Sequence, residues 1–478
     1  MILVLVAAFA LFIGLCSSSS KPEENVAAGE DHPNIIFILT DDQDTASFAY
    51  MPNVQSLLVQ QGMTFDNFFI NDSLCCPSRT SILRGQYVHN TGIFDNQLPD
   101  GGFTKVYQDK LEEAMVPVWL HDAGYRTALV GKYLNQYPSG ADANYIPPGW
   151  SDWQAVITPN RFYDYFLTEN GERVHYGDTP EEYSTDVFAR KAVDFIKDAG
   201  AKGDAFFLYL AFNAPHGPLR AAPRHEGMYA NAQAPRPPNF NEADVSDKPD
   251  YVKNLRLAGT GNIDQNWQRR LEALQSVDDA VGAIIAALTE TGQLDNTYIF
   301  LTSDNGWVLG AHRLSHVKRV PYEDSIHVPL YVRGPGVPAG SHDTHLVNNI
   351  DLAPTWAGLA GIVRPDLDGR ALGPRLLKGQ DDSSWRKLAL IQQGAVSDDE
   401  LDGNPPDLPP YQALRTDQWL YVEYATGERE LYDMKADPFQ LDNIASTQKD
   451  VVAKLSARLN ELKSCKGQSC RDIEAKPP

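Results

Sequence analysis

The stretch Cys75-Cys76-Pro77-Ser78-Arg79 carries the side chains best suited to covalent chemistry. A thiol beside a fixed cation is a candidate nucleophile, because positive charge lowers the pKa of a thiol. Two other interpretations stay open: a disulfide between the adjacent cysteines, and cysteines that only pack, above all Cys76. The stretch follows the aromatic and apolar run 65–74 and is expected to lie on a loop.

Charged and polar residues follow four predicted buried strands. The continuous apolar runs 34–40, 126–131, 205–211 and 297–302 are typical of central strands in a parallel sheet. In open α/β sheets, functional groups gather at the carboxyl ends of such strands. Taken alone, each of these charged or polar residues is better explained as a turn residue or a solvated surface residue. Their joint occurrence at the strand ends predicts that they form one functional site. In chain order the groups are Asp41 and Asp42, Lys132, His216, and Asp304 and Asn305.

Predicted helices alternate with these strands to about residue 365, which favours a mostly parallel sheet covered by helices. Segments 135–165 and 217–262 show no clear period and are expected to be irregular. The α/β pattern defines a main domain over 31–375. The predicted helices cover 51–63, 116–124, 180–200 and 266–291.

A smaller C-terminal subdomain of the α+β type is predicted over 380–478. Its sequence favours short antiparallel strands at 388–391, 411–416 and 419–424, followed by an amphipathic helix at 448–463. Cys465 and Cys470 are expected to form a short-loop disulfide there. Zinc binding is the competing interpretation, but partner ligands are missing beside this pair.

The net charge limits the possible binding partners, and the N-terminal segment indicates where the protein is located. The formal net charge of −22 argues against binding to nucleic acid or to an anionic membrane surface. The apolar run 1–15 is too short to span a bilayer and precedes a serine-rich stretch, so residues 1–28 are expected to be a signal peptide with a short polar lead. The predicted location is therefore periplasmic, extracellular or lysosome-like, without a membrane span. Lipid anchoring through Cys16 is an alternative, although Leu15 rather than a small residue precedes it.

The cysteine stretch resembles the signature of the type I sulfatases. Cys75 has the Cys-x-Pro-Ser-Arg spacing with Cys76 as x, and Leu83 and Gly85 complete the pattern. The order of the strand ends is similar to that family over about residues 33–470. The resemblance implies an alkaline-phosphatase-like fold, with a catalytic domain over 31–375. It also implies oxidation of Cys75 to formylglycine by a formylglycine-generating enzyme, and hydrolysis of a sulfate ester of a small molecule or oligosaccharide, either a sulfated sugar or an aryl sulfate.

The same resemblance implies roles for the strand-end residues. Asp41, Asp42, Asp304 and Asn305 would bind a metal, and four oxygen donors suit a hard cation, Ca²⁺ more than Mg²⁺. Arg79 would hold the aldehyde hydrate and stabilise the carboxylates. The two sulfate-clamping lysines would be Lys132 and Lys318, and His216 would transfer a proton to the leaving oxygen.

One position departs from the family pattern. Many sulfatases have Gly-Lys-x-His, whereas this chain has Leu134 in place of the histidine. Gly-Lys-Tyr-Leu-Asn resembles the glucosamine-6-sulfatase and extracellular heparan-sulfatase branch, as do residues 145–150 and the paired cysteines. The base of the second step is therefore open. Asn135, His312 and His316 are candidates for contact with the substrate.

A second enzyme class shares the fold implied by the resemblance, namely phosphoester and phosphonate-ester hydrolases. Alkaline phosphatases proper would need more His and Asp ligands for two zinc ions. A third, non-enzymatic interpretation is a degenerate sulfatase that only binds sulfated glycans. Such a protein would have lost a metal ligand or the nucleophile. The sequon at Asn71 lies so close to Cys75 that a glycan would obstruct the pocket. We therefore expect Asn71 to be unmodified, or the protein to come from an organism without such glycosylation.

Overall fold

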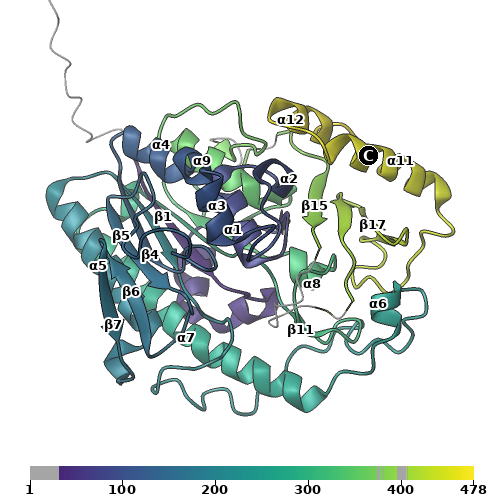
Figure 1. The fold of residues 1–478 in the computed structure, drawn as a ribbon, viewed down its shortest axis with the longest axis horizontal. Helices are drawn as coiled ribbons and strands as arrows, with labels where there is room; N and C mark the ends of the chain where they lie inside the picture. The colour runs from purple at the N-terminus through teal and green to yellow at the C-terminus, as the bar shows by residue number, and fades with distance from the viewer. Residues whose placement is uncertain (1–31, 374–376, 381, 396–404, 406, 478) are drawn as a thin grey trace, which may run out of the picture.

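A ten-stranded sheet organises the protein, for which the computed structural model describes residues 32–373, 377–380, 382–395, 405 and 407–477 (Figure 1). The strand order is β13-β2-β12-β9-β1-β8-β4-β5-β6-β7. The central pairs β9·β1, β1·β8, β8·β4 and β4·β5 are parallel. The strands of this sheet are β1 (Asn34–Thr40), β2 (Met63–Phe65), β4 (Arg126–Gly131), β5 (Asp152–Ile157), β6 (Tyr165–Glu169), β7 (Glu172–Tyr176), β8 (Phe206–Ala211), β9 (Thr297–Ser303), β12 (Leu330–Arg333) and β13 (Ser341–Asp343).

Helices cover both faces of the sheet (Figure 1). On one face, the long helices α5 (Ser184–Lys202) and α7 (Thr260–Glu290) pack against Ile36 and Ile38 of β1. On the other, α4 (Val116–Asp122) and α9 (Leu352–Leu359) pack with Phe37. Because successive side chains of a strand point to opposite faces, one unbroken apolar run supplies both cores. The shorter helices are α1 (Cys75–Arg84), α2 (Val88–Thr91), α3 (Gly102–Gln108), α6 (Asp250–Lys253) and α8 (Glu323–Ile326), and the helical turns are η1 (Thr45–Tyr50), η2 (Val54–Val59), η3 (Leu111–Ala114), η4 (Pro180–Glu182), η5 (Leu294–Asn296) and η6 (Asn349–Asp351).

The predicted fold class is confirmed, and the structure corrects three segments within it. Residues 135–165 are not irregular throughout, because β5 extends the sheet and is followed by the antiparallel strands β6 and β7. The short helix predicted at 51–63 is present but shorter, as the π-helix η2, which ends at Val59 before β2 begins. The predicted helix 266–291 begins six residues earlier, at Thr260. Two-stranded ladders β3 (Phe68–Phe69) with β14 (Val347–Asn348) and β10 (Val308–Leu309) with β11 (Ser315–Val317) complete the main domain.

The C-terminal subdomain is a four-stranded antiparallel sheet, which confirms the predicted architecture. The prediction lacked the fourth strand and the last helix. The boundary between 375 and 380 stays a prediction, since residues 374–376 lie outside the described part. The elements are β15 (Ala389–Gln393), β16 (Tyr411–Arg415), β17 (Trp419–Tyr424), β18 (Arg429–Asp433), α11 (Lys449–Leu462) and α12 (Gln468–Glu474).

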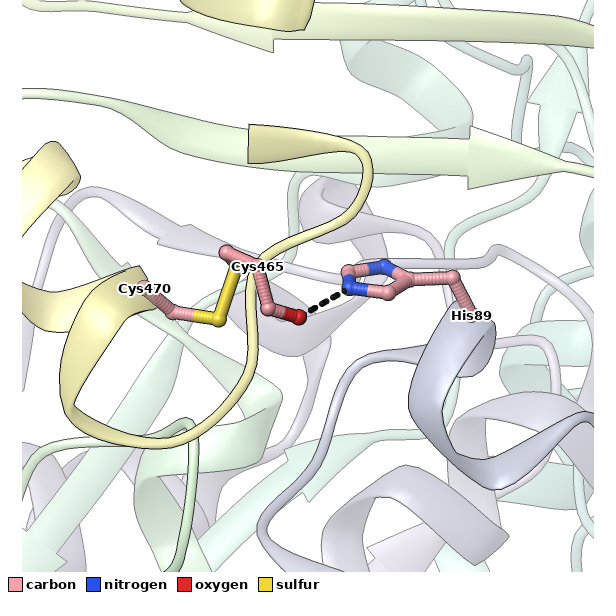
Figure 2. A group of neighbouring side chains, drawn as sticks. All are labelled: His89, Cys465 and Cys470. Carbon is pink, nitrogen blue, oxygen red and sulfur yellow. Dashed lines mark hydrogen bonds between the residues drawn. A yellow bond between two sulfur atoms is a disulfide. The ribbon is translucent and has the colours of Figure 1, made fainter. Parts of the chain in front are cut away.

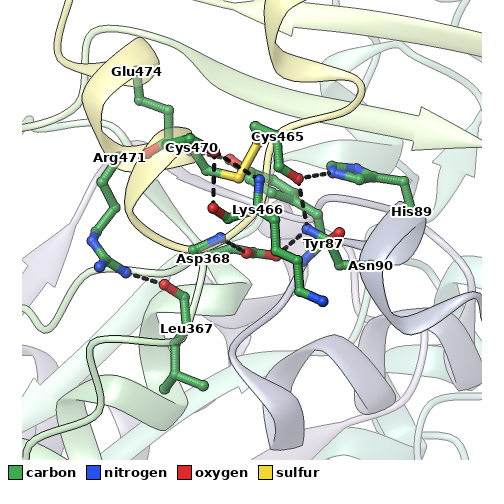
Figure 3. The surroundings of a disulfide bond; sticks show 12 residues. Tyr87, His89, Asn90, Leu367, Asp368, Cys465, Lys466, Cys470, Arg471 and Glu474 are labelled. Carbon is green, nitrogen blue, oxygen red and sulfur yellow. Dashed lines mark hydrogen bonds between the residues drawn. A yellow bond between two sulfur atoms is a disulfide. The ribbon is translucent and has the colours of Figure 1, made fainter.

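Cys465 and Cys470 form the predicted disulfide between α11 and α12. His89 Nε2 donates to the Cys465 carbonyl oxygen at 2.9 Å, and the two sulfurs are bonded to each other (Figure 2), so this trio is a structural contact rather than a metal site. The closed loop is also bound to the main domain (Figure 3), because Asp368 accepts the backbone N–H of Gly467 at 2.6 Å. Asn90 donates both to Asp368 and to the Cys465 carbonyl. The disulfide closes this loop, and the hydrogen bonds from His89 and Asn90 attach the loop to α2.

The predictions for the N-terminal segment concern residues that the structure does not describe. The signal peptide over 1–28 and the anchoring role of Cys16 lie outside the described residues. Among the helices of the described part, none is both long and apolar enough to cross a bilayer.

Candidate active site

Cys75 is the first residue of helix α1, not part of a loop as expected from the sequence. The helix tolerates Pro77 because the first N–H groups of a helix have no partner within it. It ends at Gly85, whose φ of 62° suits glycine. Cys75 therefore lies at the positive end of the helix dipole, and Arg79 lies one turn later on the same side.

The thiol of Cys75 is buried beside a lysine and a carboxylate. Lys318 Nζ lies 3.0 Å from its Sγ atom, and Asp41 Oδ1 lies 3.5 Å away. Burial raises the pKa of this thiol well above its ordinary value, although Lys132 and Lys318 oppose the shift. The neighbouring cations act in the expected direction, but desolvation outweighs them, so the expectation of a lowered net pKa for this thiol is wrong. Burial therefore disfavours the thiolate form of an unmodified Cys75.

Three carboxylates gather next to Cys75, each offering an oxygen within 4.8 Å of the others. They belong to Asp41, Asp42 and Asp304, which follow the adjacent strands β1 and β9. Asp304 Oδ1 accepts the backbone N–H of Asp42 at 3.1 Å. Asn305 donates its amide N–H to Asp42 at 2.7 Å. The buried Oδ1 atom of Asn305 has no hydrogen-bond partner among the described residues. Three carboxylates and an unpartnered amide oxygen fit a hard cation.

Three buried cations balance these carboxylates. Burial would raise the pKa of Asp41, but Lys132, with Nζ 2.6 Å from Oδ2, leads a group of cations that holds it well below the ordinary value. Lys318 donates to Asp42 at 2.8 Å. Arg79 binds Asp304 through Nε and Nη2, both at 2.8 Å. The site therefore combines strong negative and positive charge in a volume shielded from water.

His216 lies at the solvent side of this group. Its Nε2 is 3.6 Å from Asp42 Oδ2, and its side chain is 20% exposed, whereas those of Lys132 and Lys318 are 2% and 1% exposed. Nδ1 lies 2.6 Å from the Gly217 carbonyl oxygen, which can only accept, so Nδ1 carries the proton of the neutral ring. Nε2 is then the atom that can exchange a proton at the opening of the site.

Three predicted substrate contacts, Asn135, His312 and His316, lie outside this cluster. His312 is buried, with Nδ1 2.5 Å from Glu242 Oε2 and its ring against Tyr322. The backbone carbonyl of Asn135 accepts from Phe103, and its buried Oδ1 has no hydrogen-bond partner in the described part of the chain. His316 Nδ1 lies 2.9 Å from Ser315 Oγ. The structure therefore joins nine of the predicted site residues in one network and leaves these three beside it.

Arg270 is a site residue that the sequence analysis missed. Its guanidinium donates to the backbone carbonyls of Asp42 and of Pro215, the residue before His216. It also lies 3.5 Å from Asp44 and over the ring of Trp307. A signal was present, because Arg270 shares helical spacing with the buried residues Trp267, Leu271 and Leu274.

The sequon residue Asn71 is fully buried, and its amide N–H donates to Ser81 Oγ at 3.1 Å. The amide nitrogen is therefore inaccessible to a glycan in the folded protein, in agreement with the expectation.

Comparisons with known proteins agree with this geometry. The family model described as "Sulfatase" matches residues 33–362, and the model "N-sulphoglucosamine sulphohydrolase, C-terminal" matches residues 310–465. The chain is 36% identical to N-acetylglucosamine-6-sulfatase of Homo sapiens, over 93% of this chain and 87% of that protein. It is 35% identical to an arylsulfatase of Volvox carteri, over 93% and 76% of the two chains.

A solved structure of a protein in complex with its substrate D-glucosamine-2-N,6-O-disulfate superposes with a TM-score of 0.76 at 26% identity, covering 92% of this chain and 98% of that one. The matched family segment contains Cys75, the carboxylate cluster and all three cations. The chain therefore belongs to the sulfatase family, and it hydrolyses sulfate esters.

Proposed function

We propose that the protein is an exported sulfatase that removes the 6-O-sulfate of glucosamine residues in sulfated glycans. The observation that carries this proposal is the buried cluster of Cys75 with three carboxylates and three cations, which suits a tetrahedral anion and a hard cation together. Similarity to N-acetylglucosamine-6-sulfatase over nearly the whole chain supports the choice of sugar, as does the structural match to a protein bound to a 6-O-sulfated glucosamine.

We further propose that Cys75 acts after oxidation to formylglycine by a formylglycine-generating enzyme. The modified residue supplies an aldehyde hydrate as nucleophile in place of a thiol. The raised pKa of the Cys75 thiol supports this proposal, because an unmodified thiol would stay protonated at neutral pH. Lys318, 3.0 Å from Sγ, and the N-terminus of α1 would stabilise negative charge on the oxygen that replaces the sulfur.

A divalent cation, Ca²⁺ or Mg²⁺, would be held by Asp41, Asp42, Asp304 and Asn305. Such an ion supplies positive charge that polarises the sulfate. The unpartnered Oδ1 of Asn305 supports this assignment. Arg79 orients the Asp304 carboxylate through two contacts of its guanidinium. Burial raises the pKa of that carboxyl, and the charge of Arg79 opposes the shift.

The remaining side chains then have distinct tasks in the hydrolysis of a sulfate ester by water to an alcohol and sulfate. Lys132 and Lys318 neutralise sulfate oxygens during transfer, since both ammonium groups are buried and remain charged. When both of its ring nitrogens are protonated, His216 is placed to give the Nε2 proton to the leaving alcohol oxygen. Asn135 and His312 stay candidates for contact with the sugar.

Mass spectrometry of the tryptic peptide ending at Arg79 tests the nucleophile. Protein produced with a formylglycine-generating enzyme should show the aldehyde mass at Cys75, and Cys76→Ala should retain it. Cys75→Ala should abolish hydrolysis of glucosamine 6-sulfate. An unmodified thiol combined with full activity of Cys75→Ala would contradict the mechanism.

A substrate panel tests the sugar and the bond. We expect glucosamine 6-sulfate to be hydrolysed faster than glucosamine 3-sulfate, 4-nitrophenyl sulfate or a phosphonate monoester. Faster hydrolysis of the phosphonate would favour the phosphoester and phosphonate-ester alternative.

A further inference from the structure

The C-terminal subdomain contacts the segment that carries Lys318. Tyr322, four residues after Lys318, donates its hydroxyl to Glu430 Oε1 in β18 at 3.0 Å. Glu430 is fully buried, and it also accepts the hydroxyls of Tyr432 and Tyr424, both at 2.5 Å. One buried carboxylate thus binds three tyrosines, of which only Tyr322 belongs to the main domain.

The neighbouring residue is held by the same subdomain. Glu323 accepts from Arg415 Nε of β16 at 2.8 Å, and its backbone N–H donates to Gln440 at 2.9 Å. Two consecutive residues of the main domain therefore have three polar contacts with the C-terminal sheet and its following loop.

The backbone just before Tyr322 has an unusual conformation that surrounding contacts must hold in place. His312, Arg313, His316 and Arg319 have φ values of 51°, 66°, 61° and 72°. L residues rarely adopt this conformation, and it persists only where surrounding contacts hold it.

The start of this segment is held from within the main domain. Glu242 pairs with His312, and Arg313 donates to the carbonyls of residues 242, 243 and 255. Lys318 therefore lies between two anchored ends, and its Nζ reaches both Cys75 and Asp42.

We propose that Glu430 is a positioning residue for Lys318, acting through the Tyr322 hydroxyl. The C-terminal subdomain would then complete the active site without touching the substrate. This inference rests on the proposed function only where it assigns Lys318 to the sulfate; the placement of Lys318 can be tested separately.

Acylation of lysines with acetic anhydride, read by peptide mass spectrometry, tests that placement without an activity assay. Lys318 and Lys132 are almost completely buried, so both should be protected in the unaltered protein. Glu430→Gln replaces one acceptor oxygen by an amide donor, so at least one tyrosine loses its acceptor. We expect acylation of Lys318 to rise several-fold while Lys132 on β4 stays protected.

Glu423→Gln is the matched control, because it makes the same change on the neighbouring strand β17, away from Tyr322. It should leave Lys318 protected and the activity unchanged. Equal labelling of Lys318 and Lys132 in Glu430→Gln would indicate general loosening, and unchanged protection of both would also overturn the proposal.

Tyr322→Phe provides a milder second variant, since it removes one hydroxyl and keeps the ring against His312. We expect kcat/KM for the sulfate ester to fall by about tenfold to a hundredfold, as for a clamping group displaced by about 1 Å. Tyr432→Phe, which removes another hydroxyl from the same carboxylate, should have a smaller effect. Equal losses in both variants would overturn the role of Tyr322. If the unaltered protein hydrolysed no sulfate ester, the proposed function would fail, whereas the acylation result would still decide the positioning role.

Discussion

Lys318 Nζ lies 3.0 Å from Cys75 Sγ, although the two residues are 243 positions apart in the chain. The same ammonium group donates to Asp42, so a single cation links the nucleophile position to the carboxylate cluster. Burial would lower the pKa of Lys318, but Asp42 and its neighbours hold it well above the ordinary value. The ammonium group is therefore charged at neutral pH.

Replacing Asn305 by alanine should weaken binding of the divalent cation. The change removes the unpartnered Oδ1 and one hydrogen bond to Asp42. Inductively coupled plasma mass spectrometry should find less Ca²⁺ per chain, and the rise in Tm on adding Ca²⁺ should shrink. For the unaltered protein that rise should correspond to about 3 kcal/mol at a Ca²⁺ concentration 100 times Kd, and a chelator should reverse it.

Asn349→Ala serves as the control for this change. Asn349 is equally buried, but its amide donates to Ser78 rather than to the carboxylates. Cation binding that is as tight in Asn305→Ala as in Asn349→Ala would contradict the assignment of Asn305.

Glu112 should make stability fall as the pH rises through neutrality. Burial raises the pKa of this carboxyl from 4.5 to about 7, although the hydroxyls of Tyr133 and Tyr145 donate to it. Between these two values the folded state holds a proton that the unfolded state has released. The free energy of unfolding therefore decreases with pH over this window, by up to about 3 kcal/mol.

Urea titrations between pH 4.5 and pH 8 measure this dependence. Glu112→Gln should flatten the slope, because glutamine stays neutral and still accepts a hydroxyl. Glu113→Gln, at the exposed neighbour, should keep the slope of the unaltered protein. Equal slopes in both variants would show that Glu112 is not the titrating group.

Arg270→Met should destabilise the protein and slow hydrolysis together. The change leaves the carbonyls of Asp42 and Pro215 without their donor and removes the cation beside Asp44. Loss of such buried contacts costs about 3 kcal/mol in the free energy of unfolding. The variant Arg269→Met, at the exposed neighbouring position, should change neither quantity. Full stability of Arg270→Met would count against this role.

Much of the fold could be predicted because the central strands are buried on both faces. The run 34–40 must lie inside a sheet, and the polar residues directly after it must lie at the sheet's edge. Strand β5 was harder to predict, since its apolar residues are interrupted and lie between proline- and glycine-rich turns. Helix α1 was also missed, because its first turn contains two cysteines and a proline instead of a helical pattern.

By itself, the sequence determined which residues can act: Cys75 through its spacing to Arg79, and the groups at the four strand ends through the apolar runs before them. The tertiary structure alone decided their electrostatics. A cation beside a thiol lowers its pKa, whereas burial raises it by removing water. At Cys75 the effect of burial is the larger, so the net pKa is raised. The structure also revealed Arg270 and Glu430, because the contacts that they make join segments far apart in the chain, and the partners in such contacts cannot be read from a local sequence pattern.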